Sequence, residues 1–422
     1  MLDYINGVSR ARSIRALLLS TLAFTACFAV WTIFSIIGIS IKNQLDLSST
    51  QFGVLVAAPI LTGSLTRLVL GVWTDQYGGR IVFTIIMLIS SFCTYLLTYI
   101  TSFNTCLMVA LGVGLAGGGF AVGVAYVSVW FSREHQGTAL GIFGMGNAGA
   151  AVTNFGAPFL LVSFGWNGVV QIYAFCLFLM AVLFYIGTET DPIVMGRKKA
   201  GIPPIPFIKQ IEPLAEIRVW RFALYYYFVF GAFVALALWL PNYYMNVYHL
   251  PIAVAGMLTS LYSLPGSIFR ALGGWLSDIV GARMVMYWTF SVSLICLFFL
   301  SYPECSFIIQ GVSGEVLTFS LKVELLPFVL LTVVLGFFMS LGKAAVYKHI
   351  PVYYPHNVGA TGGIVGLIGG LGGFSLPIIF GVMNDFTKVW PSCFMLLFAI
   401  TGVSLLWMHF AIVTLERKGL HL

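Results

Sequence analysis

The chain is made of apolar segments that are each long enough to cross a lipid bilayer. An α-helix needs about 20 consecutive apolar residues to span the hydrocarbon core. Only 8% of the 422 residues are charged, against about 25% in soluble proteins. The sequence therefore predicts a helical membrane protein with no room for a large soluble domain. The twelve predicted spanning segments are 15–41, 52–74, 81–103, 106–131, 138–165, 168–187, 219–247, 252–276, 284–302, 325–353, 358–383 and 389–415.

Composition excludes several other classes of protein. The 45 glycines and the absence of alternating ten-residue segments argue against an outer-membrane barrel. The seven cysteines stand singly in apolar sequence, so we expect neither a disulfide framework nor a zinc site. The histidines fall at helix ends, in loops or near the C-terminus, without the spacing of metal ligands. We expect no metal, no cofactor and no enzyme, and the sequence shows no phosphate-cradling loop that would indicate ATP drive.

A polar stretch divides the twelve segments into six and six. This stretch, with five prolines and four basic residues, is predicted to be a cytoplasmic linker at 188–217 between an N-terminal bundle, 1–187, and a C-terminal bundle, 218–422. Fifteen of the 21 Lys and Arg residues fall in segments on the side of the linker and termini, and three fall in outer loops. Positive residues mark the cytoplasmic side, so both termini are expected inside. The net charge of +7 is then a topology signal, and nothing indicates nucleic acid.

The same ten-residue pattern occurs in both halves of the chain. Residues 71–80 and 274–283 match in step at a glycine, an aspartate, a second glycine and an arginine. Parallel repeats of six helices are typical of alternating-access transporters. Both runs resemble the loop motif of the major facilitator superfamily. The resemblance implies an all-α membrane protein, twelve transmembrane helices in two pseudo-symmetric six-helix bundles, and a gating role for Asp75, Arg80, Asp278 and Arg283.

Two arginines occupy equivalent positions inside the predicted membrane helices. Arg67 and Arg270 each lie eight residues before the motif aspartate, about 12 Å along the helix from the loop. A charged residue at the bilayer centre costs about 2.5–3.5 kcal/mol on insertion scales. Every acidic residue lies at a helix end, in a loop or at a terminus, so no carboxylate can pair with them at this depth. We interpret the pair as a site for a small anion, because a guanidinium fork suits a planar oxyanion.

Lys343 is the third basic residue, besides Arg67 and Arg270, that is counted neither in the cytoplasmic segments nor in the outer loops. It lies about 27 Å along its helix if that helix begins after Glu324, so it can extend to the cytoplasmic surface. Gly141 and Gly144 align with Gly363 and Gly366, and the same offset places Lys343 beside Phe120, at the depth of the arginines. In that second position it could carry a proton, which matters because the membrane segments contain no carboxylate to do so. The sequence leaves both readings open.

Two glycine-rich helices occupy equivalent places in the halves, at 141–151 and 362–374. Small residues allow membrane helices to approach closely, which explains either helix alone. Together with the paired arginines, they resemble the signature of the nitrate/nitrite porter family. The resemblance implies that these helices slide past each other and that Asn147 contacts the substrate. The glycines expected to act in this movement are Gly144, Gly146, Gly149, Gly366, Gly369 and Gly370.

The same resemblance extends to the predicted anion site. Arg67 and Arg270 match the family's substrate-binding pair, and four aromatic residues match positions that line the nitrate site, namely Phe28, Phe120, Tyr226 and Phe230. Two positions depart from the pattern. Gly366 stands where some relatives carry serine, and Gly119 stands where some carry asparagine, so two polar contacts to the anion are missing.

The sequence thus predicts a secondary active transporter of nitrate or nitrite in the cell inner membrane, acting as a monomer in the lipid bilayer. Two cations that face one monovalent anion leave the empty cavity positively charged. This charge disfavours the return of the empty carrier and favours the exchange of one anion for another. The 343–351 run resembles the branch that couples nitrate to protons, and on this basis symport is preferred. One alternative is a transporter of small carboxylates such as formate or oxalate, and another is a membrane anion sensor that transports nothing.

Overall fold

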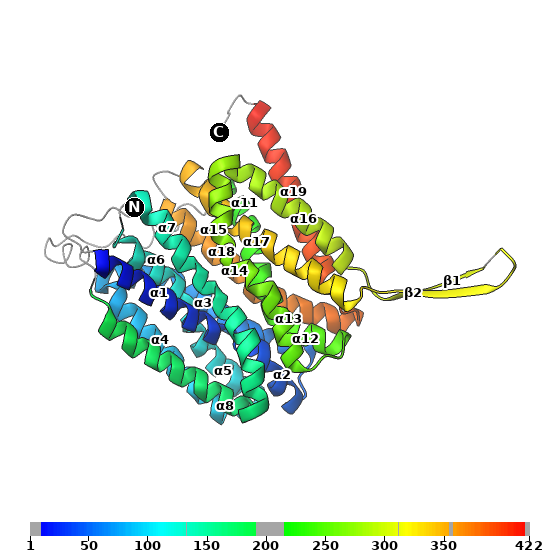
Figure 1. Cartoon of the computed structure of the whole chain (residues 1–422), viewed down its shortest axis with the longest axis horizontal. Helices are drawn as coiled ribbons and strands as arrows, with labels where there is room; N and C mark the ends of the chain where they lie inside the picture. The colour runs from blue at the N-terminus through cyan, green and yellow to red at the C-terminus, as the bar shows by residue number, and fades with distance from the viewer. Residues whose placement is uncertain (1–9, 132, 191–214, 311, 354–357, 418–422) are drawn as a thin grey trace.

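The structure is a computed structural model that describes residues 10–131, 133–190, 215–310, 312–353 and 358–417. Its helices form two adjacent groups (Figure 1). The first group, up to Gly187, consists of α1 (Arg10–Trp31), α2 (Phe34–Gln44), α3 (Ser49–Tyr77), α4 (Gly79–Leu96), η1 (Leu97–Tyr99), α5 (Phe103–Val113), η2 (Gly114–Gly118), α6 (Gly119–Ser128), α7 (Arg133–Gly144), η3 (Met145–Ala148) and α8 (Gly149–Gly187).

The second group begins at Ile217 and holds a short β-hairpin besides its helices. It consists of α11 (Ile217–Tyr226), η5 (Tyr227–Ala232), α12 (Phe233–Val247), α13 (Ile252–Ser263), α14 (Pro265–Ile268), α15 (Arg270–Leu276), η6 (Ser277–Gly281), α16 (Ala282–Leu300), β1 (Cys305–Gln310), β2 (Val316–Leu321), α17 (Leu325–Tyr353), α18 (Val358–Thr387) and α19 (Ser392–Arg417). The predicted division of the chain stays a prediction, because most of the linker 188–217 lies outside the described residues.

The helices have the length and apolar character of membrane spans. Within the described residues, nine stretches qualify by length and composition. Two of them, Ala139–Gly187 and Ile252–Leu300, are 49 residues long, which corresponds to about 74 Å of helix, more than twice the hydrocarbon thickness. Each turns back at a glycine with positive φ, Gly165 (φ 65°) or Gly281 (φ 87°). Each therefore has the length of two crossings, and the described helices confirm the predicted all-α membrane fold. The count of twelve crossings stays a prediction.

The β-hairpin was not predicted and is the one departure from helix in the described chain. Its strands pair antiparallel from Cys305 opposite Leu321 to Gln310 opposite Val316. It projects from the bundle between α16 and α17, on the side away from the chain termini (Figure 1). The hairpin lies between the predicted spans 284–302 and 325–353, in a segment that is expected to be an outer loop.

The two groups of helices meet along α3 with α18 and along α8 with α13. Glycines make these contacts close. A Cβ on Gly53 of α3 would meet the carbonyl oxygen of Pro377, and one on Gly256 of α13 would meet that of Asn154. Asp385 of α18 accepts hydrogen bonds from the main-chain N–H of Thr50 (2.7 Å) and of Ser49 (3.2 Å). Its carboxylate thus caps the first turn of α3 and holds the halves together at the end opposite the termini.

Candidate functional site

The two arginines predicted from sequence meet at one aromatic ring in the interior. The guanidinium carbon of Arg67 lies 5.6 Å from the centroid of the Phe120 ring, and that of Arg270 lies 5.8 Å from it. The two cations are therefore within about twice that distance of each other. Arg67 is 7% exposed. The structure thus brings two like charges from different halves to the same buried region.

Each arginine contacts the glycine-rich helix of the opposite half. Arg67, on α3, donates from Nη1 to the carbonyl oxygen of Gly366 on α18 at 3.0 Å. Arg270 begins α15, and a Cβ on Gly144 of α7 would be 3.7 Å from its Nη1. Gly144 and Gly366 are the residues that the sequence alignment pairs. The arrangement is therefore reciprocal. The surroundings of each arginine depend on how the two halves are placed relative to each other.

Aromatic rings line the region around the guanidinium groups. The Phe230 ring lies 5.5 Å from the Arg67 guanidinium carbon and stacks on Tyr226 at 5.1 Å with an interplanar angle of 11°. Trp31 also faces Arg67, at 5.8 Å. Phe28 packs edge to face on Trp31, with the ring centroids 5.2 Å apart. Of the four predicted aromatics, Phe120, Phe230 and Tyr226 lie at the arginines or one ring away, and Phe28 lies in the next layer.

Several hydrogen-bond donors in this region, or on the helices around it, have no partner among the described residues. They are Nε of Arg67, Nη1 of Arg270, Nδ2 of Asn147 and the hydroxyl of Ser64. Asn147 is 1% exposed, and such buried polar groups are normally paired. None of the ion pairs in the described chain includes Arg67 or Arg270. The described residues contain no cluster of metal ligands. The region is therefore a set of cationic and amide donors that suits a small anion.

Irregular helix geometry places these side chains. Asn147 lies in η3, a 3₁₀ turn between α7 and α8, and Phe120 follows η2, another 3₁₀ turn. Phe230 lies in η5, a π-helical segment, and Arg270 follows a break at Phe269. Short 3₁₀ and π segments inside helices are typical of functional positions. Arg67 instead projects from α3, which has no such segment between Ser49 and Tyr77.

Lys343 is fully buried, so it does not extend to the surface as one reading of the sequence proposed. It is 0% exposed and donates from Nζ to the carbonyl oxygen of Gly266 at 2.7 Å. Its Nζ also lies 3.1 Å from the centroid of the Phe233 ring. Gly266 is one helical turn before Arg270. Lys343 therefore lies inside the second half, next to the helix break that carries Arg270.

Two of the predicted gating residues of the loop motifs, Arg80 and Asp278, make contacts within their own halves. Arg80 donates from Nε and Nη2 to the Tyr185 carbonyl oxygen at 3.0 and 2.6 Å, which ties α4 to the end of α8. Asp278 forms an ion pair with Lys348 of α17. Asp75 lies in the last turn of α3, and its side chain is outside what the structure describes.

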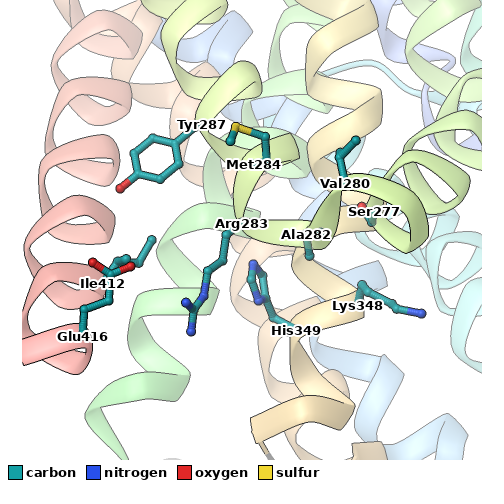
Figure 2. A pocket seen from close by; sticks show the side chains of 11 residues that line it. Ser277, Val280, Ala282, Arg283, Met284, Tyr287, Lys348, His349, Ile412 and Glu416 are labelled. Atoms are coloured by element: carbon teal, nitrogen blue, oxygen red, sulfur yellow. The ribbon is translucent and has the colours of Figure 1, made fainter. Parts of the chain in front are cut away.

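Arg283 lines a separate pocket at the end of the bundle where the termini lie. Figure 2 shows its guanidinium between Glu416 of α19 and His349 of α17. His349 is 8% exposed and stacks on Phe222 at 5.6 Å. This pocket contains neither Arg67 nor Arg270. It is therefore distinct from the arginine region.

The predicted sliding glycines do contact large groups of neighbouring helices. A Cβ on Gly146 would meet Phe24, one on Gly149 would meet the main chain of Thr25 and Ala29, and one on Gly369 would meet Tyr226. A Cβ on Gly370 would lie 3.4 Å from Nη1 of Arg67. These positions therefore tolerate only a hydrogen atom or a shifted neighbour.

Sequence reasoning missed three residues of this region, Trp31, Ser64 and Tyr347. Tyr347 packs its ring edge to face on Tyr226 at 5.0 Å and lies 5.7 Å from the guanidinium carbon of Arg270. A signal was present, because Tyr347 is one helical turn after Lys343 and so shares its face of α17. Because 15% of the residues are aromatic, Tyr347 does not stand out in the sequence.

Comparison with known proteins assigns the family. The sequence model of the Major Facilitator Superfamily matches residues 19–321 and 252–420. The chain belongs to this superfamily. It is 42% identical to the "Probable nitrate/nitrite antiporter NarK1" of Thermus thermophilus, over 98% of this chain and 95% of that protein. It is 28% identical to the "Nitrite extrusion protein" of Bacillus subtilis, over 96% and 95%. The predicted membership of the nitrate/nitrite porter branch is thereby confirmed.

Solved structures agree with the fold. A bacterial homologue of the human lysosomal transporter Spinster, in an inward-facing and occupied conformation, superposes with a TM-score of 0.73 at 16% identity, covering 97% of this chain and 99% of that one. A mutant of the nucleoside transporter NupG superposes with a TM-score of 0.70 at 13% identity, covering 93% and 99%. At these identities the likeness concerns the fold alone. The chain is thus a multi-pass membrane protein of a transporter family.

Proposed function

We propose that this protein is a secondary active transporter that carries nitrate or nitrite by alternating access between its two halves. The observation that carries the proposal is the pair of the buried Arg67 and the half-buried Arg270, which share the Phe120 ring and have no carboxylate partner among the described residues. A monovalent anion between them would interact favourably with both guanidinium groups and reduce their net charge from +2 to +1. The names of the Thermus and Bacillus relatives support nitrate and nitrite as that anion.

The geometry favours a small, flat and weakly hydrated anion. A guanidinium offers donors in a plane and matches two oxygens of a planar oxyanion. The amide of Asn147 offers a further donor. The rings of Phe120, Phe230 and Tyr226 replace water around the anion and give nothing to a strongly hydrated one such as chloride. A small carboxylate such as formate has the same planar pair of oxygens and is the competing substrate.

For the energy source we propose proton coupling through Lys343, which is buried at the Arg270 helix break. An anion that binds beside Arg270 would stabilise a proton on Lys343, and release of the anion would favour release of the proton. The name of the Thermus relative indicates exchange of nitrate for nitrite, and this is the alternative. The two modes differ in what drives uptake, a pH gradient or internal nitrite.

We also propose that the protein is monomeric and lies in the cell inner membrane with both termini in the cytoplasm. The bias of basic residues supports this orientation. Three of them, Arg10, Arg12 and Arg15, fall within 15 residues of the N-terminus. The end closed by Asp385 would then face outward.

The test is uptake into vesicles by the Arg67→Lys and Arg270→Lys variants beside the parent. Lysine keeps the charge but loses the planar fork, so we expect nitrate uptake to fall at least about tenfold, which corresponds to about 1.4 kcal/mol. Arg12→Lys is the matched control, because the Arg12 side chain is 57% exposed. Normal uptake by both site variants would show that the paired arginines do not bind the substrate.

The identity of the anion is tested by thermal stabilisation of the purified protein. A ligand that binds only the folded state raises the melting temperature increasingly as its concentration exceeds Kd. We expect stabilisation by nitrate and nitrite and none by chloride. Stabilisation by formate and not by nitrate would identify a carboxylate transporter and contradict the assignment.

A further inference from the structure

Tyr347 lies where two glycines of α18 leave space for it. Its hydroxyl donates to the carbonyl oxygen of Gly362 at 3.1 Å. A Cβ on Gly366 would be 2.7 Å from the same hydroxyl, closer than real Cβ atoms approach an oxygen. The hydroxyl therefore fills the space that a side chain at position 366 would need.

The Tyr347 side chain lies between Arg270 and the main-chain segment that binds Arg67. On one side its ring is 5.7 Å from the Arg270 guanidinium carbon. On the other side is the main chain of Gly366, whose carbonyl oxygen accepts from Arg67 at 3.0 Å. The Tyr226 ring packs against it at 5.0 Å and 76°, which holds the ring in place. Tyr347 is thus fixed beside both cations with a hydroxyl at its tip.

The hydroxyl can change its partner without movement of the ring. A phenolic O–H rotates about its C–O bond and donates one hydrogen bond at a time. Its present acceptor, the Gly362 carbonyl, lies inside α18, where a helical carbonyl retains its main-chain partner. Turning the O–H away from Gly362 therefore costs little. A hydrogen bond from this hydroxyl to an anion is stronger than one to a neutral carbonyl, because the acceptor is charged.

We propose that Tyr347 is a further substrate-binding residue, whose hydroxyl donates to an oxygen of the anion held between Arg67 and Arg270. This inference rests on the proposed function. Donors would then reach the anion from α3, α15 and α17, besides the Asn147 amide of η3. Nitrate has a third oxygen for this additional donor, whereas nitrite and formate have two. Tyr347 would therefore favour nitrate over the two-oxygen anions.

The test compares the binding of nitrate and nitrite by the purified parent and by Tyr347→Phe, which removes only the hydroxyl. We expect Kd for nitrate to rise about tenfold, and Kd for nitrite to rise at most about threefold. A purely structural role would raise both equally and would lower the melting temperature of the free protein. Equal changes, or no change in either Kd, would overturn the inference.

A second experiment moves the hydroxyl from one helix to the other. Gly366→Ser alone places a side chain against the Tyr347 hydroxyl, so we expect weakened nitrate binding. The double variant Tyr347→Phe with Gly366→Ser relieves this contact and restores a hydroxyl, so it should bind nitrate more tightly than either single variant. If the double variant is the weakest of the three, the two positions do not share a role and the inference is wrong.

The two proposals fail in different ways. If the parent binds no nitrate and Arg67→Lys changes nothing, the proposed function is wrong. If the parent binds nitrate and Arg67→Lys abolishes binding, but Tyr347→Phe binds like the parent, only the role of Tyr347 is wrong.

Discussion

At the scale of single residues, the three basic side chains inside the bundle, Arg67, Arg270 and Lys343, differ in what compensates their charge. Lys343 has a carbonyl acceptor and an aromatic face, both within its own half. Arg67 and Arg270 each retain a donor with no partner among the described residues. Burial of a charge is costly unless hydrogen bonds and opposite charges compensate it. The arginines are therefore the groups that gain most from an anion, and Lys343 responds to it through Arg270.

The proposed proton carrier, Lys343, gives a prediction that separates the driving force of uptake from substrate binding. Lys343→Gln cannot bind a proton, and Lys343→Arg cannot release one, because the guanidinium stays protonated. We expect both variants to lose nitrate uptake driven by an inward pH gradient while they retain exchange of external nitrate for internal nitrite. Uptake into vesicles under each gradient measures this.

The control for this experiment is Lys322→Gln, since the Lys322 side chain is 53% exposed and lies after the β-hairpin. Its uptake should match that of the parent under both gradients. Persistent pH-driven uptake in Lys343→Gln would show that the proton travels by another group. Loss of exchange in both Lys343 variants would instead place Lys343 in the substrate site itself.

At the scale of helices, close glycine contacts decide where substitutions are tolerated. A Cβ on Gly149 would meet the main-chain atoms of Thr25 and Ala29 in α1, and a main chain cannot turn aside as a side chain can. A Cβ on Gly156, seven residues later in α8, would meet nothing within 4 Å. The same chemical change therefore has opposite consequences on one helix.

We predict that Gly149→Ala lowers the melting temperature of the purified protein and nitrate uptake, whereas Gly156→Ala lowers neither. Overpacking costs about 1–3 kcal/mol, while alanine in an open helical position gains about 1 kcal/mol over glycine. Thermal unfolding in detergent and vesicle uptake measure the two effects. Equal melting temperatures for the two variants would show that α1 and α8 are not packed as described.

Length and charge made the spanning helices predictable, but the breaks within them were not. Apolar runs report how much chain lies in the membrane, and two Arg residues in apolar sequence indicate a site. The π-helical turn at Phe230 and the break before Arg270 depend on packing against other helices, which no local pattern encodes. The contact of Tyr347 with Gly366 joins α17 to α18 in the same way. The sequence therefore predicted the two arginines better than the helix breaks and helix contacts that surround them.

At the scale of the whole molecule, the halves are joined at the end opposite the termini. Asp385 caps α3 across the interface, and Asn384 donates from Nδ2 to the Ser49 hydroxyl at 3.1 Å. Deeper in the bundle, Arg67 reaches Gly366 of the other half. Alternating access requires the outermost of these contacts to part in each cycle. The hydrogen bonds at Asp385 and Asn384 are suited to this, because water can replace them when the halves separate.

Cross-linking this end should therefore stop transport. We predict that Ser49→Cys with Asn384→Cys, in a background without the native cysteines, loses nitrate uptake on oxidation and regains it on reduction. Phe386→Cys paired with Ser49→Cys is the matched control, because the Phe386 side chain is 89% exposed and its thiol should not reach. Full uptake by the cross-linked 49–384 pair would mean that the halves do not separate at the Asp385 end, and that the anion enters by a route other than alternating access.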